Sequence, residues 1–233
     1  MSNNIAIILA RGGSKRLPGK NIIDFHGKPM VAWTIEAATT SEKFSKVLLS
    51  TDSSDIADIG REFGAEVPFL RESAADDVAT SSEATLAALY QSEQYWGEEF
   101  STVTQMMANC PLRDAVDIIR SVDNFYQSNA PAQISCFRYG WMNPWWAATL
   151  DHNGLPEYLF PDARKSRSQD LPELYCPSGA IWIADARQLK SAKTFYMESH
   201  IQYPLGWISS CDIDDQDDLE MANVLYRRRH DRD

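Results

Sequence analysis

Short, mainly apolar runs alternate with longer segments of helical character along most of the chain. The apolar runs predict buried strands at 5–8, 47–51, 103–107 and 133–137, with a further strand entered at 175–183. Helical spacing and capping residues predict helices at 30–40, 54–63, 83–96, 115–128 and 216–229. Strands that alternate with helices predict a parallel sheet with helical crossovers. We therefore expect an α/β fold with its ligands at the carboxyl ends of the strands.

Residues 140–178 interrupt this alternation. They hold five of the 11 prolines and three of the seven tryptophans, without a sustained helical period. Linkers seldom carry aromatic residues such as Trp145, Trp146 and Phe160, so we expect a functional insertion, with a solvated loop as the alternative. The sequence therefore predicts a single domain over 1–233, with 140–178 as an inserted arm or lobe.

Composition narrows the class of protein. With 233 residues, 44% of them hydrophobic, the chain is long enough for one sizeable α/β core. Its net charge of −11 argues against broad binding of nucleic acid. The four cysteines are far apart, which predicts reduced thiols, and the N-terminal segment resembles neither a signal peptide nor a membrane span. We expect a cytoplasmic protein that binds neither nucleic acid nor membranes.

The loop at residues 9–21 follows the first apolar run and is rich in glycine and cations. Gly12 and Gly13 permit close approach of the backbone, so that several N–H groups can converge on one anion. Four of the chain's 22 cations lie within ten residues here: Arg11, Lys15, Arg16 and Lys20. This local positive charge in an acidic chain predicts a site for a small anion such as a phosphate.

Two common phosphate motifs are excluded at this loop. A Walker A motif has four residues between its first glycine and the Gly-Lys pair, but five separate Gly13 from Gly19. Asn21 also stands where the hydroxyl that binds magnesium belongs, and the dinucleotide pattern G-x-G-x-x-G is absent. A surface turn with solvated cations is the remaining alternative to a phosphate site of another type.

The order Ala-Arg-x-x-Ser-Lys-x-Leu-Pro-x-Lys-Asn, at residues 10–21, resembles the signature loop of cytidylyltransferases that activate acylneuraminates and related sugar acids. This resemblance implies a Rossmann-like αβα sandwich with a mainly parallel sheet, of the nucleotide-diphospho-sugar transferase type. Relatives also carry an arginine followed by an Asp-x-x-x-Thr-Ser element, which Arg71 and the segment 76–83 resemble. The residues that the resemblance assigns to the nucleotide are Leu9, Ala10, Arg11, Gly12, Gly13, Ser14, Lys20, Asn21, Arg71 and Ser82.

Three further segments resemble the part of this family that contacts the sugar acid. Residues 107–113 resemble Gln-Pro-Thr-Ser-Pro-Leu-Arg in the closing Pro-Leu-Arg, with Met107 in place of the glutamine and Asn109 in place of the threonine. Residues 177–183 resemble Pro-Asn-Gly-Ala-Ile-Tyr-Ile with Ser178 in place of the asparagine, and residues 167–172 resemble an Arg/Gln-rich segment that approaches the sugar acid. The residues thus assigned to the sugar are Met107, Asn109, Arg167, Gln169, Ser178 and Gly179. A thioether cannot replace the hydrogen bonds of an amide. We therefore expect a sugar other than plain N-acetylneuraminate, such as a diamino acid of the legionaminic or pseudaminic type.

Two carboxylates precede the last predicted helix. Asp212 and Asp214 are two residues apart, so on an extended segment both face one side and can hold a hard cation such as Mg²⁺. Alternatively, Asp214 or Asp215 caps the helix. Relatives end in the same Asp-Ile-Asp, which favours the metal site.

The resemblance implies that CTP and a 2-keto sugar acid give a CMP-sugar and pyrophosphate. Arg11, Lys20 and Asp212 are the predicted catalytic residues, Mg²⁺ the cofactor, and the arm the implied dimer contact of a homodimer. Two alternatives stay open: a nucleotidyltransferase for Kdo or for another nucleotide, and a nonenzymatic regulator that binds a nucleotide.

Local roles also stay open at three positions. Asp52 or Ser53 is predicted as the N-cap of the helix at 54–63, and for Asp52 this role is preferred to that of an acid near the site. Ser81 or Ser82 is predicted as the next cap. Arg113 either acts in the site or fixes its loop by pairing with an acid.

Overall fold

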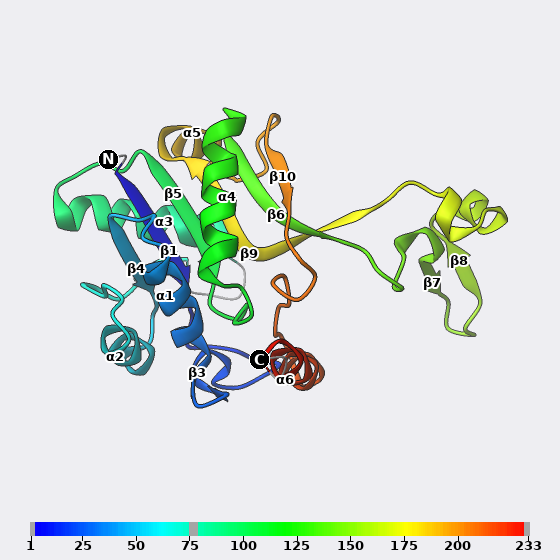
Figure 1. Cartoon of the computed structure of the whole chain (residues 1–233), viewed down its shortest axis with the longest axis horizontal. Coiled ribbons are helices and arrows are strands. Elements are labelled where there is room, and N and C mark those ends of the chain that lie inside the picture. Colours follow the sequence, from blue (N-terminus) through cyan, green and yellow to red (C-terminus); the bar gives the residue numbers. More distant parts are fainter. Residues whose placement is uncertain (1–2, 75–78, 231–233) are drawn as a thin grey trace.

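A six-stranded sheet forms the centre of the computed structural model, which describes residues 3–74 and 79–230 (Figure 1). In spatial order the strands are β10 (Ile201–Pro204), β6 (Ala132–Arg138), β9 (Tyr175–Asp185), β5 (Thr102–Met107), β1 (Asn4–Leu9) and β4 (Lys46–Ser50). All run parallel except β9, which pairs antiparallel with both β5 and β6. The predicted mainly parallel α/β sheet is confirmed.

Helices cover both faces of the sheet. On one face lie α1 (Met30–Thr40), α2 (Ser54–Glu62) and α4 (Ala115–Ser128), and on the other lie α3 (Ser81–Trp96) and α5 (Ala186–Ala192). In β1, Ala6 and Ile8 pack toward the first face, whereas Ile5 and Ile7 pack toward the second. A strand that is covered on both faces needs an uninterrupted apolar run, which β1 has. The αβα sandwich is confirmed.

The structure differs from the predictions at the start of α3. Its N-cap is Thr80, not Ser81 or Ser82. The Thr80 hydroxyl accepts from the Glu83 N–H at 3.2 Å, and the Glu83 carboxylate accepts from the Thr80 N–H at 2.7 Å. This reciprocal capping box satisfies two N–H groups that the helix leaves unpaired. Of the segment 76–83, residues 76–78 lie outside the described residues.

Two elements of the αβα sandwich, β10 and α5, were not predicted. The segment 67–71 follows the edge of β4 without joining the sheet, apart from a bridge between Leu48 and Glu66. The Arg71 N–H donates to the Thr51 carbonyl at 2.7 Å, which places Arg71 beside the end of β4.

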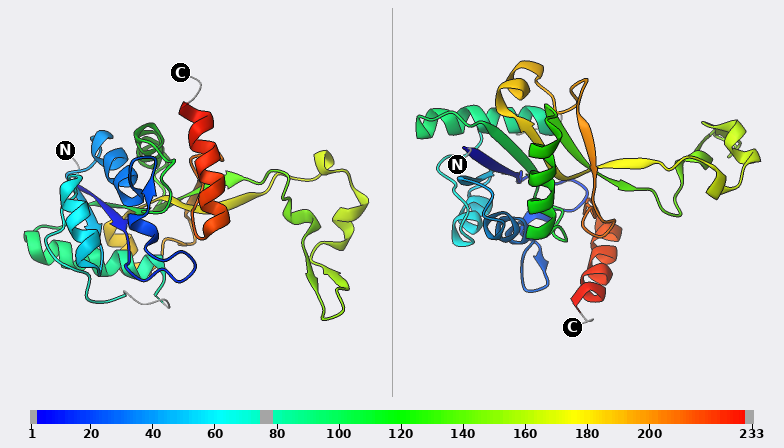
Figure 2. Two further views of the ribbon diagram at one scale, coloured as in Figure 1. Left: turned by 90° about the horizontal axis from the view of Figure 1, so that it is seen from below. Right: turned by 45° about the horizontal axis from the view of Figure 1, so that its top comes forward.

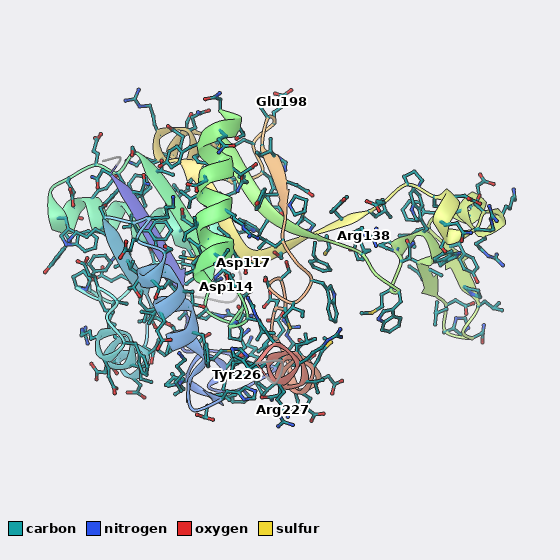
Figure 3. The ribbon with its side chains drawn as sticks, viewed as in Figure 1. Asp114, Asp117, Arg138, Glu198, Tyr226 and Arg227 are labelled. Atoms are coloured by element: carbon teal, nitrogen blue, oxygen red, sulfur yellow. The ribbon has the colours of Figure 1, made fainter. Side chains whose placement is uncertain are left out.

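Helix α6 (Gln216–His230) packs on a small apolar cluster of its own. The cluster, here called the α6 core, comprises Leu17, Phe25, Met30, Leu112, Ile213, Ala222 and Leu225. Nearby are the 3-10 helix η1 (Lys20–Ile22) and the hairpin of β2 (Asp24–Phe25) and β3 (Lys28–Pro29). Figure 3 labels Tyr226 on α6, and the Tyr226 ring contacts the rings of Phe25 and Trp33. The α6 core therefore joins the loop after β1 to the segment that precedes α6.

The segment between β6 and β9 extends away from the sheet as an arm, which Figures 1 and 2 show from three directions. It contains β7 (Ala148–Leu150), β8 (Pro156–Tyr158) and the 3-10 helices η2 (Pro144–Trp146), η3 (Pro161–Lys165) and η4 (Ser168–Asp170). Arg138, labelled in Figure 3, pairs with Glu173 at the base of the arm. Across the described residues, no helix combines the length and apolar character that a membrane span needs.

Candidate active site

A cavity of about 290 Å³ opens at the carboxyl ends of β1 and β5. Its walls come from the loop after β1, the start of α3 and the segment before α6. Ten of the residues predicted for nucleotide, sugar or metal line it: Leu9, Arg11, Ser14, Lys20, Asn21, Arg71, Met107, Asn109, Asp212 and Asp214. The sequence analysis missed five others: Ala74, Ala79, Thr80, Ser81 and Ala84. Segments far apart in the sequence thus meet at the end of the sheet where a ligand was expected.

The loop after β1 is fixed by Asp52. The carboxylate of Asp52 accepts a hydrogen bond from the Gly12 N–H at 2.8 Å. This N–H is therefore not directed at a bound phosphate, as the sequence analysis expected. Ser53, not Asp52, caps α2, since the Ser53 hydroxyl accepts from the Ile56 N–H. The predicted N-cap role of Asp52 is therefore wrong. A Cβ atom on Gly12 would lie 3.1 Å from the Ser53 Cβ, so the glycine permits this close approach.

Arg71 is a buried cation in the wall of the cavity. Its Nη1 donates to the carbonyl and the hydroxyl of Ser50, both at 3.2 Å. Burial lowers the pKa of Arg71, the Asp52 carboxylate opposes this shift, and Arg11 adds to it. Within the part of the chain that the structure describes, the Arg71 Nε is buried without a hydrogen-bond partner. A buried guanidinium with an unused donor suits an anionic or carbonyl-bearing ligand.

Asp212 and Asp214 both line the cavity because the residue between them is anchored. Ile213 is fully buried in the α6 core, and its N–H donates to the Asn109 carbonyl at 2.9 Å. The Asn109 amide contacts the Asp212 carboxylate and donates to Asp214 Oδ1 at 3.3 Å. Asn109, which was assigned to the sugar, therefore connects the carboxylate pair to the loop after β5.

The two carboxylates have opposite pKa shifts. Asp212 opens onto the cavity, but the surrounding protein displaces much of its water, and with the nearby Asp214 charge this desolvation raises its pKa to about 6. Desolvation alone would raise the pKa of Asp214 as well. Hydrogen bonds from Lys20 Nζ, at 2.8 Å, and from Arg16 outweigh it and lower the pKa of Asp214. An additional cation beside Asp212 would relieve the repulsion between the Asp212 and Asp214 carboxylates.

Asp215, not Asp214, caps α6, so one of the two predicted capping residues is confirmed and the other is wrong. The Asp215 carboxylate accepts from the Asp218 N–H at 3.1 Å, and the Asp218 carboxylate accepts from the N–H groups of Asp214 and Asp215 at 2.9 and 3.2 Å. These bonds satisfy the first turn of α6, so the Asp214 carboxylate faces the cavity instead.

Some residues assigned to the nucleotide lie outside the cavity lining. Ala10 is buried, and Gly13 is exposed. Ser82 points into the interior, where its hydroxyl accepts from the Phe195 N–H at 3.3 Å, so its assignment to the pocket is corrected in favour of Thr80 and Ser81.

The residues assigned to the sugar divide between the cavity and the arm. A Cβ on Gly179 would lie 2.7 Å from the Met107 Cγ and 3.5 Å from Asp212 Oδ2, so this glycine lets Met107 pack beside the carboxylate. The Ser178 hydroxyl instead shares a buried hydrogen bond with Ser135 at 2.9 Å. Arg167 and Gln169 lie in the arm, where Arg167 pairs with Asp170 at 2.7 Å, and neither lines the cavity of its own chain.

Arg113 is a structural residue, but its partners are not acids as expected. Its side chain is 1% exposed and donates to the Ala180 carbonyl at 2.7 Å and to the Thr34 hydroxyl at 2.6 Å. A longer bond, at 3.4 Å, reaches the Met107 carbonyl. Arg113 thereby ties β9 and α1 to the end of β5, beneath the cavity.

An αβα sandwich with a cationic loop after its first strand, and with a carboxylate pair facing that loop, defines an α/β nucleotidyltransferase. The chain belongs to the cytidylyltransferase family, since the family model described as "Cytidylyltransferase" matches residues 5–136.

Relatives that align over nearly the whole of this chain agree with this assignment and with the resemblance found in the sequence. The pseudaminic acid cytidylyltransferase of Campylobacter jejuni serotype O:23/36 is 32% identical over 228 residues, which cover 97% of both chains. The N-acylneuraminate cytidylyltransferase of Escherichia coli O18:K1:H7 is 34% identical over 97% of this chain and 52% of its own. The solved CMP:2-keto-3-deoxy-manno-octonic acid synthetase complexed with CTP has a TM-score of 0.71 at 15% identity, covering 98% of this chain and 100% of that one. At that identity the likeness supports the fold alone.

Proposed function

We propose that this protein transfers the cytidylyl group of CTP to a nonulosonic acid, a sialic acid-like 2-keto sugar acid, releasing pyrophosphate. The observation that carries the proposal is the cavity in which Arg11 and Lys20 face Asp212 and Asp214 at the end of β1. The names of the two relatives support a sugar acid as the acceptor. The four free cysteines agree with a reducing compartment, so we place the reaction in the cytoplasm.

In the proposed reaction the anomeric hydroxyl of the sugar attacks the α-phosphorus of CTP, and the bond to the β-phosphate breaks. Arg11 and Lys20 neutralise the triphosphate and the leaving pyrophosphate, where negative charge develops. Lys20 is held toward this end of the cavity by Asp214, and Asn21 holds the Arg11 carbonyl at 2.9 Å. The cations are therefore positioned before the ligand arrives, and no covalent intermediate is required.

Asp212 and Asp214 would hold Mg²⁺. The donor set fits, since both side chains offer hard oxygen ligands to one cavity and Asp212 lies in a repulsive field that a cation relieves. Among residues 3–74 and 79–230, no cluster of three or more Asp, Glu, His or Cys residues is arranged to hold a metal, so water and phosphate would supply the other positions. When bound, Mg²⁺ withdraws charge from the reacting phosphate.

The sugar is proposed to be a diamino nonulosonic acid of the pseudaminic or legionaminic type. Met107 packs on Gly179 beside Asp212, and the sequence resemblance aligns this thioether with the amide that contacts the sugar acid in sialic acid enzymes. A thioether offers no strong hydrogen bond to a hydroxyl. The similarity to a pseudaminic acid cytidylyltransferase supports the same class.

The reaction is tested by pyrophosphate release with CTP, Mg²⁺ and a panel of acids, with mass spectrometry of the products. The panel contains pseudaminic, legionaminic and N-acetylneuraminic acids and Kdo. We expect a CMP-sugar with a diamino acid and at least about tenfold less product with N-acetylneuraminic acid, as is usual when one polar contact is mismatched. Preference for Kdo, or for a nucleotide other than CTP, would favour another nucleotidyltransferase. Tight CTP binding without turnover of any acid would favour a regulator.

The arm is proposed to make a homodimer, and there Arg167 and Gln169 would approach the partner's cavity. The arm exposes 85% of Trp141, 69% of Leu150 and 65% of Leu155. Single exposed apolar residues are common on protein surfaces, whereas several on one small segment indicate an interface.

We therefore expect Trp141→Asp to convert a dimer into a monomer in sedimentation velocity. Tyr95→Asp is the matched control, because Tyr95 is a similarly exposed aromatic residue, 60% exposed, on α3 of the body. A monomeric wild-type protein, or an equal effect of both changes, contradicts the assignment of the interface to the arm.

A further inference from the structure

The peptide unit between Arg11 and Gly12 is held at both of its polar ends by side chains from other segments. Its N–H donates to Asp52 Oδ1 at 2.8 Å, and its carbonyl accepts from Asn21 Nδ2 at 2.9 Å. Asn21 lies in η1 after the loop, whereas Asp52 lies between β4 and α2. The plane of this peptide is therefore fixed relative to the sheet, in a loop that otherwise has no regular structure.

Asp52 is itself held by the backbone around it. The Ser53 N–H donates to the Thr51 hydroxyl at 3.1 Å, and the Thr51 carbonyl accepts from the Arg71 N–H. Ser53 caps α2, and its Cβ packs against Gly12. Asp52 does not line the cavity, so we expect no direct contact between its carboxylate and a ligand there.

We propose that Asp52 is a positioning residue that orients the Arg11–Gly12 peptide and thereby directs the Arg11 side chain to the triphosphate of the nucleotide. This inference rests on the proposed function, in which CTP occupies the cavity. The direction of the Arg11 Cα–Cβ bond is set by the two peptide units that flank its Cα. The first follows the buried Ala10, and the second is the Arg11–Gly12 peptide. Hydrogen bonds at both ends of that second peptide fix its orientation.

A purely electrostatic role and a positioning role of Asp52 predict opposite changes in CTP affinity when Asp52 is replaced. The direction of the change therefore tests the proposal. The Asp52 carboxylate lies close enough to the cavity wall to act on Arg71, since its charge opposes the lowering of the Arg71 pKa by burial. Removing a negative charge near a binding site for a polyanion strengthens binding if only the charge matters. Removing a positioning contact weakens it.

The experiment measures CTP and cytidine affinity by calorimetry for the wild type, Asp52→Ala, Asp52→Asn and Ser53→Ala. We expect Asp52→Ala to bind CTP about fivefold more weakly, the usual size of one lost hydrogen bond, with unchanged cytidine affinity. Asp52→Asn keeps an acceptor oxygen and should restore CTP affinity to within about twofold of the wild type. Ser53→Ala, the matched control, should lower the melting temperature of the protein by loss of the α2 cap without changing CTP affinity.

A double-mutant cycle identifies Arg11 as the residue through which Asp52 acts. In an Arg11→Ala background, adding Asp52→Ala should weaken CTP binding by less than about twofold. Equal or tighter CTP binding by Asp52→Ala, or additive effects in the cycle, would overturn the inference while leaving the proposed function intact. Absence of CTP binding by the wild type would overturn both. Asp52 is exposed, so its replacement is not expected to prevent folding.

Discussion

Replacing Asp212 with asparagine is expected to lower turnover by about a thousandfold, because one preorganised charge at a reacting phosphate contributes on that order. Asparagine has the same size and keeps a contact to Asn109, but it cannot complete a pair of carboxylates around Mg²⁺. The measurement is the rate of pyrophosphate release at saturating CTP and sugar, over a series of Mg²⁺ concentrations. Asp217→Asn is the matched control, since it removes one exposed carboxylate from the first turn of α6.

The same variant separates a catalytic from a structural role. Because the pKa of Asp212 is raised to about 6, its ionised form is less favourable in the folded protein than in the unfolded one at pH 7. A neutral asparagine is therefore not expected to lower the free energy of unfolding. Near-normal turnover of Asp212→Asn, or an equal loss in Asp217→Asn, would contradict the assigned role.

Replacing Arg113 with methionine is expected to lower the free energy of unfolding by about 3 kcal/mol, because buried acceptors lose a charged donor that no water can replace. Methionine has a similar length but leaves the carbonyls of Ala180 and Met107 and the hydroxyl of Thr34 without this partner. Urea denaturation measures the change, with Arg120→Met on the exposed face of α4 as the control.

Arg113→Met also tests whether the residue acts only through structure. We expect the folded fraction to keep its preference for CTP, since Arg113 does not line the cavity. A loss of less than about 1 kcal/mol would mean that the cost of burying the guanidinium cancels its hydrogen bonds.

The best predicted elements are those whose signals are local. The structure gives α1 and α4 the predicted bounds, since α4 has a clear apolar face, α1 is mainly apolar, and each has a defined start, at Pro29 for α1 and at the capping residue Asp114 for α4. By contrast, β10 has only four residues at the edge of the sheet, in which half-buried and exposed side chains alternate. Helix α5 has only seven residues. Elements this short carry too few apolar positions to show a period.

Candidate site residues were found where a motif is continuous in sequence, as in the loop after β1 and the Asp212–Asp214 pair. The contacts of Asp52 with Gly12 and of Asn109 with Asp212 join residues 40 and 103 positions apart, so they depend on strand order, which the sequence does not reveal. Ser82 was wrongly assigned to the cavity because it lies on the side of α3 that faces the interior. One position along a helix turns a side chain by about 100°, which moves it from the cavity to the interior.

The α6 core has a consequence for how the protein comes into being on the ribosome. Lys20 and Asp214 are 194 residues apart, yet Leu17 beside the first and Ile213 beside the second share one apolar cluster with α6. Closing so long a loop is entropically costly, and contacts of this range form late in folding. The cationic loop is synthesised early but lacks its carboxylate partners until α6 has emerged and docked. The proposed nucleotide site is therefore complete only after α6 has docked on the α6 core, and we expect a nascent chain that still lacks α6 to bind CTP weakly.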